Sequence, residues 1–173
     1  MSRARVCFSH GKESPPWGTK IKALASIAEQ AGWQVDSLDY QGIDDPNARV
    51  ELLRQWCADC DEPYVLVGSS MGGHVAAVVA NQVRPGGLFL MAPAFYMPGY
   101  EDHTPIAPAC PVVIVHGWHD DIIPWQNSAR FGALSSARVV FMDSDHRLID
   151  VLPQVGHEFE VFLGSLSDTG VSK

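Results

Sequence analysis

The chain has little charge, few cysteines and no long apolar run, and each shortage excludes a class of protein. Only 18% of its 173 residues are charged, and acidic residues outnumber basic ones, which gives a formal net charge of −8. An acidic chain has no electrostatic attraction for nucleic acid or for an anionic membrane surface. We therefore expect neither as a partner, whereas a small neutral or apolar molecule is compatible with this composition.

Membrane-spanning and secretory features are missing as well. No stretch approaches the roughly 18 consecutive apolar residues of a membrane span. The opening segment MSRARVCFSHG passes directly into a strand-like run and lacks the apolar region of a signal peptide. We therefore expect a cytoplasmic protein, in which the four cysteines stay as reduced thiols.

Metal-binding and redox motifs are also lacking. Cys57 and Cys60 form a CxxC, but neither a second pair of ligands nor a redox-type βαβ context accompanies them. The histidines show no HExxH spacing. The sequence therefore predicts no metal and no cofactor.

The apolar content is high enough for a core of ordinary size. Hydrophobic residues make up 46% of the chain, and no linker, repeat or low-complexity run divides it. We predict one domain over residues 1–166. The polar segment SDTGVSK, residues 167–173, is predicted to be a loose tail.

Short apolar runs alternate with longer segments whose apolar residues recur at helical spacing. The runs predicted as strands are residues 5–10, 33–40, 64–68, 88–93, 111–117 and 137–143. The segments predicted as helices are residues 20–32, 46–60, 73–83, 125–134 and 148–166, the last broken near Pro153. Strands that alternate with helices form βαβ units. We therefore predict an α/β fold, a three-layer sandwich whose mainly parallel six-stranded sheet is covered on both faces.

One serine occupies an unusual position between a predicted strand and a predicted helix. The segment YVLVGSSMGGHVAAVVA places Ser70 two residues after Gly68 and two before Gly72. A tight strand-to-helix turn strains the serine backbone and needs flanking residues without side chains, so that the hydroxyl projects into a site. A phosphate-binding turn is the alternative, but the Lys-Ser/Thr pair of a P-loop and the GxGxxG pattern are absent.

A serine hydroxyl becomes a nucleophile only when a base takes its proton. Two later strand ends offer the partners. Asp120 and Asp121 follow the predicted strand 111–117, and His146 follows the predicted strand 137–143. Because the carboxyl ends of parallel strands meet at one edge of the sheet, these side chains are expected near Ser70.

With these motifs in order along the chain, the sequence resembles the α/β-hydrolase superfamily, most closely its small, lid-poor, esterase-like bacterial members. VGSSMGG resembles the nucleophile elbow, VHGWHDDIIP the HGxxDxxVP signature, DSDHRL the histidine loop and FSHGKES the oxyanion loop. The resemblance implies a minimal sheet of order 2-1-3-4-5-6.

The same resemblance assigns roles to individual residues. Ser70 would be the nucleophile, His146 the base and Asp120 the acid, while a register error of one would make Asp121 the acid instead. The backbone N–H groups of Met71 and Lys12 would form the oxyanion hole. His116, in a His-Gly turn, is interpreted as structural.

The chain departs from the family pattern in two places. It begins directly at the oxyanion-loop strand, and the connection where larger members carry a lid is only residues 94–110. We therefore expect an open, shallow site, or one completed by a second subunit in a homodimer. Five aromatic residues near strand ends are candidates for its apolar pocket, with ordinary burial in the core as the alternative for each: Trp17, Phe95, Tyr96, Trp118 and Trp125.

The resemblance implies a serine hydrolase that cleaves small carboxylic esters through an acyl-serine intermediate. A thioesterase or amidase would use the same three residues. The alternative to an enzyme is a non-catalytic binding protein of the same fold, although such proteins have ordinarily lost a member of the triad.

Overall fold

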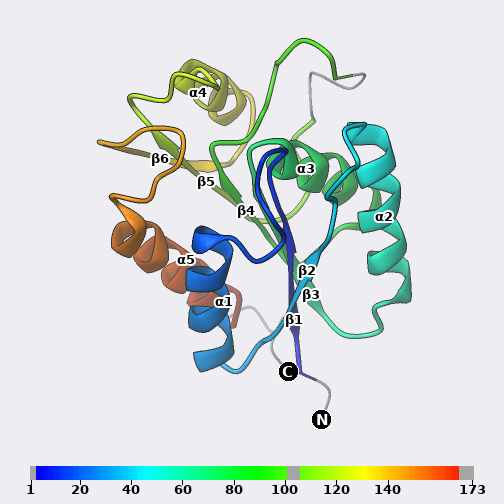
Figure 1. Cartoon of the computed structure of the whole chain (residues 1–173). Helices are drawn as coiled ribbons and strands as arrows, with labels where there is room; N and C mark the ends of the chain where they lie inside the picture. The colour runs from blue at the N-terminus through cyan, green and yellow to red at the C-terminus, as the bar shows by residue number, and fades with distance from the viewer. Residues whose placement is uncertain (1–2, 101–105, 168–173) are drawn as a thin grey trace.

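The computed structural model describes residues 3–100 and 106–167, which form one sheet and the helices around it (Figure 1). Its strands are β1 (Arg5–Ser9), β2 (Gln34–Leu38), β3 (Tyr64–Ser69), β4 (Leu88–Met91), β5 (Val112–Gly117) and β6 (Arg138–Met142). Its helices are α1 (Thr19–Gln30), α2 (Pro46–Asp59), α3 (Met71–Val83), α4 (Trp125–Ala133) and α5 (Leu152–Ser167).

The strands of the sheet follow the order β2-β1-β3-β4-β5-β6, and every neighbouring pair is parallel. This confirms the predicted fold class and strand order. The pairing aligns the strand ends, with Ser9 opposite Gly68, Ser69 opposite Met91 and Gly117 opposite Met142. All carboxyl ends therefore lie at one edge, where side chains from distant segments can meet.

Successive residues of each strand point to opposite faces of the sheet, and each face has its own core. Val6 and Phe8 pack with α1 and α5 on one face, while Cys7 packs with α2, α3 and α4 on the other. Figure 1 shows the same division of the helices into two layers. Buried strands this apolar on both sides are typical of parallel sheets.

Local signals explain most helix boundaries, and one prediction about them was wrong. Asp45 caps α2, since its side chain accepts a hydrogen bond from the Asn47 N–H at 2.9 Å, and Pro46 occupies the first helical position. The last helix was expected from residue 148 with a break near Pro153, but α5 begins at Leu152. Proline fits the first turn of a helix because its missing N–H would have no helical partner there. Leu148 cannot belong to the helix, because its φ is 58°.

The predicted tail falls almost wholly outside the described residues, apart from Ser167, which ends α5. Within the described part of the chain, no helix is both long and apolar enough to cross a membrane.

Candidate active site

Ser70 forms the sharp turn between β3 and α3 and has a strained backbone, with φ 53° and ψ −118°. Hydrogen bonds hold it in place. Its N–H donates to the Met91 carbonyl at 3.0 Å, and its own carbonyl accepts from the N–H groups of Gly73 and Ala94 at 3.0 and 2.9 Å. A non-glycine residue keeps such a conformation only where its surroundings enforce it, which is common at functional sites.

The two glycines of the turn are required by close backbone approaches. A Cβ atom on Gly68 would lie 2.5 Å from the Gly72 carbonyl oxygen, and one on Gly72 would lie 1.9 Å from the Ser9 carbonyl oxygen. Both distances are far inside van der Waals contact. The spacing of glycines around the serine therefore has the steric cause that the sequence indicated.

The structure brings together the three side chains singled out from the sequence. His146 Nε2 lies 3.1 Å from Ser70 Oγ, and His146 Nδ1 lies 2.6 Å from Asp120 Oδ2. The Asp120 carboxylate can only accept, so the proton sits on Nδ1. Nε2 is then free to accept the Ser70 hydroxyl proton, which is the tautomer that a general base needs.

Asp120, and not Asp121, faces the histidine. The side chain of Asp120 is fully buried, whereas Asp121 is exposed. The N–H groups of Ile122 and Ile123 donate to Asp120 Oδ1 at 2.9 and 2.8 Å. Burial raises the pKa of Asp120, but hydrogen bonds from His116, His146 and these two N–H groups outweigh it and hold the pKa below its usual range.

His116 lies directly behind the acid. Its Nε2 is 3.0 Å from Asp120 Oδ2 and 3.0 Å from the Ile123 carbonyl, so the proton must be on Nε2. Its Nδ1 then accepts from Ser128 Oγ at 2.7 Å. The sequence interpretation of His116 as a turn residue missed this contact. The only signal was its position four residues before Asp120, which by itself does not give the direction of the ring.

The loop after β1 carries Lys12 and is held by buried polar groups. The His10 ring accepts from the Tyr40 N–H at 2.8 Å and donates to the Gly11 carbonyl at 2.7 Å. The buried Arg49 guanidinium donates to the His10 carbonyl at 3.2 Å. Nothing in the sequence connects Arg49 or Tyr40 with this loop, because Tyr40 follows β2 and Arg49 lies on α2.

The two backbone groups expected to stabilise an oxyanion are free to do so. Met71 and Lys12 both border the cavity that contains Ser70. Within residues 3–100 and 106–167, the N–H groups of these two residues have no hydrogen-bond acceptor. They are therefore available to a ligand.

Ser70 and His146 open into a cavity of about 820 Å³ at the carboxyl edge of the sheet. Its apolar wall differs from the expected one: it consists of Pro15, Ile21, Met71, Tyr100, Ile122, Ile123 and Ile149. None of the five predicted aromatic residues lines it. Phe95 is buried in the core against Phe131, with ring centroids 4.6 Å apart. Trp118 and Trp125 pack on Phe141 instead.

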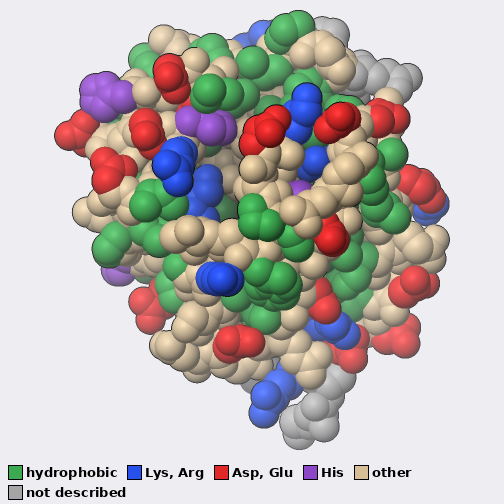
Figure 2. Space-filling model, viewed as in Figure 1, with side chains coloured by type: hydrophobic (Ala, Val, Ile, Leu, Met, Phe, Trp, Pro, Cys, Tyr) green, Lys and Arg blue, Asp and Glu red, His purple; other side chains and the backbone are tan. Residues whose placement is uncertain are grey.

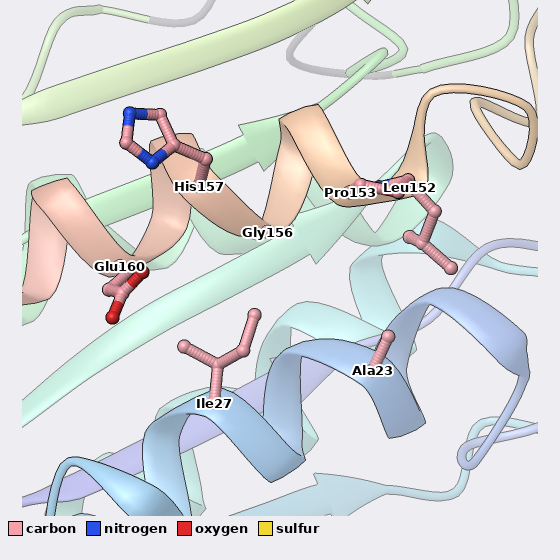
Figure 3. Close-up of a pocket in the computed structure, with 7 residues that line it drawn as sticks. All are labelled: Ala23, Ile27, Leu152, Pro153, Gly156, His157 and Glu160. Atoms are coloured by element: carbon pink, nitrogen blue, oxygen red, sulfur yellow. The ribbon is translucent and has the colours of Figure 1, made fainter.

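A second hollow, of about 400 Å³, lies between α1 and α5 and is separate from the first (Figure 3). In Figure 3, Ile27 points from α1 toward α5, while the His157 ring points away from α1. No serine or cysteine is among the described residues that line this hollow. Elsewhere in the described residues, no group of three His, Cys, Asp or Glu side chains is placed to hold a metal ion.

A parallel sheet with a serine on a strained elbow, and a histidine and an aspartate after later strands, defines the α/β-hydrolase class. The chain belongs to the alpha/beta hydrolase domain family, whose sequence model matches residues 3–160. The predicted family resemblance is thus confirmed.

Individual relatives agree with this assignment. The chain is 27% identical over 204 aligned residues to the mitochondrial palmitoyl-protein thioesterase ABHD10 of Homo sapiens, covering 83% of this chain and 67% of that protein. A solved structure from Xanthomonas campestris pv. campestris, assigned to the alpha/beta superfamily of hydrolases, is 32% identical with a TM-score of 0.87, covering 95% and 99% of the two chains. The mouse alpha/beta hydrolase domain-containing protein 10 shares the fold, with a TM-score of 0.79 at 20% identity and coverage of 95% and 90%.

Proposed function

We propose that the protein is a serine hydrolase that cleaves small carboxylic esters through an acyl-serine intermediate. One observation carries the proposal: the continuous hydrogen-bonded series from Ser70 through His146 to the buried Asp120, which opens into a large cavity. A binding protein would have no need to keep all three groups in register, with the serine on a strained turn.

In the first half of the reaction, Ser70 Oγ attacks the ester carbonyl carbon while His146 Nε2 takes the hydroxyl proton. The carbonyl oxygen becomes an oxyanion, which the N–H groups of Met71 and Lys12 stabilise. Each such donor contributes about 3 kcal/mol in enzymes where it has been measured. When the intermediate collapses, the C–O bond to the leaving alcohol breaks and the imidazolium donates its proton to that oxygen.

In the second half, His146 takes a proton from water, which attacks the acyl-serine carbonyl. The bond to Ser70 Oγ breaks, Oγ regains a proton from the imidazolium, and the carboxylic acid leaves. Throughout, Asp120 keeps the imidazole in the required tautomer and stabilises its charged form. It accepts two backbone hydrogen bonds and is therefore held as a carboxylate.

A thioester is the second candidate substrate, because the similar mammalian proteins are named palmitoyl-protein thioesterases. The same residues suffice, since a thiolate leaves more readily than an alkoxide and needs less help from the acid. An amide would demand full protonation of the leaving nitrogen by His146. Parallel assays of an aryl acetate, acetyl thiocholine and an aryl acetamide separate the three activities.

The direct test is covalent labelling with a fluorophosphonate. One adduct per chain should form, peptide mapping should place it on Ser70, and Ser70→Ala should abolish both labelling and ester hydrolysis. Heat-unfolded protein is the control and should not react, since labelling depends on the assembled triad. A folded protein that gains no adduct, or gains it on another residue, contradicts the proposal.

A further inference from the structure

The charged side chains that line the active-site cavity are not equivalent. Five of them are exposed to solvent: Lys12, Glu13, Asp121, Asp145 and Arg147. Lys20, near the start of α1, differs from these five residues, because it is partly buried at the cavity wall. A cation removed from water is costly unless an opposite charge compensates it.

No described carboxylate pairs with Lys20. Neither the Lys20 ammonium nor the Arg147 guanidinium has an ion pair or a side-chain hydrogen bond to any residue in the described ranges. Three arginines elsewhere differ in this respect, since Arg5, Arg54 and Arg138 each contact a carboxylate. Lys20 and Arg147 are therefore available to a ligand.

Lys20 also occupies an unfavourable position for a cation, in the first turn of its helix. The first turn of α1 contains Lys20 and Lys22 and no acidic residue, and Gly18 provides no side-chain cap. The positive end of a helix dipole disfavours cations there. Burial lowers the pKa of Lys20 to about 8; Asp120 and Asp145 raise it, and Arg147 lowers it further. At neutral pH the charged ammonium still prevails, beside a second cation that repels it.

We propose that Lys20, assisted by Arg147, binds a carboxylate carried by the substrate, so that the enzyme prefers esters or thioesters bearing a negative charge over neutral ones of the same size. This inference rests on the proposed hydrolase function and names the substrate class of the same site. A monoanionic carboxylate suits the cavity better than a dianion, because the exposed carboxylates of Asp121 and Asp145 border it too.

The proposed preference for anionic substrates depends on charges inside the cavity and not on the net charge of the chain, which is negative. The net charge of −8 repels anions at long range. On the face shown in Figure 2, acidic and basic side chains are interspersed and form no broad basic patch. We therefore attribute the preference to Lys20, which is partly buried in the cavity wall, with Arg147 at the exposed border of the cavity. A charge–charge contact shielded from water is stronger than one in bulk water.

The test compares matched substrate pairs that differ in one charge. Mono-4-nitrophenyl adipate against 4-nitrophenyl hexanoate places the charge on the acyl part, and 4-acetoxybenzoate against its methyl ester places it on the leaving group. For each pair the measured quantity is the ratio of kcat/KM values, anionic over neutral. Lys20→Met should lower this ratio about tenfold or more in at least one pair, mainly through KM, as expected for loss of a charge-assisted hydrogen bond.

Two variants and a salt titration complete the design. Lys22 lies two residues away on α1 and is exposed, so Lys22→Met should leave both ratios unchanged. Lys20→Arg, which keeps the charge, should retain most of the preference. In wild-type protein, the affected ratio should fall toward the Lys20→Met value as NaCl is raised to about 0.5 M, because salt screens the contact.

The two proposals fail in different ways. If Ser70→Ala still hydrolyses both members of a pair, the proposed serine hydrolase is wrong. If hydrolysis depends on Ser70 but Lys20→Met changes neither ratio by more than about twofold, the range of ordinary surface substitutions, the carboxylate site is overturned while the hydrolase stands. A Lys20→Met protein that does not fold leaves the salt titration of the wild type to decide, since an unchanged ratio there also overturns the site.

Discussion

Two hollows in the described part of the chain border helix α1, and the side chains that line them differ in their chemistry. The larger, of about 820 Å³, contains a strained serine, a histidine and unpaired cations, with a fully buried carboxylate behind them. The smaller, of about 400 Å³ between α1 and α5, has an apolar floor, with the polar side chains His157 and Glu160 on α5 (Figure 3).

The difference follows from where each hollow lies. The larger is at the carboxyl edge of a parallel sheet, where loops from β1, β3, β5 and β6 converge and can aim side chains at one point. The smaller lies between two helices, whose side chains are fixed by helical packing and do not converge. A concave surface is therefore not enough to indicate an active site. The informative feature is that a nucleophile, a base and an acid converge on one point.

The largest expected effect is in the larger hollow, at the acid. Asp120→Asn should lower kcat by about 10⁴-fold, because an amide in that position presents the wrong histidine tautomer. Asp121→Asn changes an exposed neighbour and should cost about twofold or less, as surface substitutions do. Steady-state kinetics with the thermal midpoint of each variant checks this. Reversed losses at equal stability would make Asp121 the acid.

The same substitution should change how stability depends on pH. The pKa of Asp120 is below its usual range, so its carboxylate stabilises the fold above about pH 4, the ordinary range of aspartate. This contribution is lost as the pH falls through the lowered pKa. Denaturant titrations of Asp120→Asn should therefore show a flatter loss of stability on acidification than those of the wild type. Equal slopes would mean that the carboxylate is not stabilised in the folded state.

A smaller effect on kcat is expected for His116, which contacts Asp120 and not the serine itself. His116→Gln removes the ring that donates to Asp120 Oδ2 and releases Ser128, so Asp120 should lose its fixed direction. A misplaced catalytic group costs up to about 10²-fold, and we expect a loss in kcat of that order, with KM little changed. His119→Gln is the control, since that histidine pairs with Asp143 at the exposed surface. Equal effects of both variants would show that His116 has no positioning role.

Substrate size should have a milder influence. The cavity wall includes Ile122, whose side chain is 58% exposed and therefore cannot enclose a long acyl chain. Each methylene that finds apolar contact contributes at most about 0.8 kcal/mol, and the gains stop when the contact area is used up. Acetyl to butyryl 4-nitrophenyl esters should therefore have a higher kcat/KM than esters of about ten or more carbons. A kcat/KM that rises to the longest chain would mean that an enclosed tunnel exists.

The smallest effect on activity is expected in the smaller hollow. Ile27→Ala removes the side chain that α1 directs toward α5, and it should lower the free energy of unfolding by about 1–3 kcal/mol as a partly buried truncation. The kcat/KM should change by no more than about twofold, the range of a substitution far from the chemistry. Denaturant titration and the standard ester assay together test this. A large loss of activity at retained stability would show that the two hollows are coupled.

The sequence by itself determined the order of the elements and the position of the candidate site. Apolar periodicity, the cap at Asp45 and the glycines around Ser70 are local signals, because each reflects contacts made within a few residues. Parallel strand order then required Ser70, Asp120 and His146 to reach the same edge. Local signals failed at α5, which begins at Leu152 with Pro153 in its first turn, whereas the apolar pattern placed the start of the helix at residue 148.

Tertiary structure alone decided which groups face one another within that edge. The contact of His116 with the acid, the displacement of the aromatic side chains from the cavity and the unpaired state of Lys20 all depend on side-chain directions in loops or at helix ends. His146 meets Asp120 and Ser70 across 26 and 76 residues of chain. Because packing between such distant segments sets these directions, no local pattern of residues can encode them.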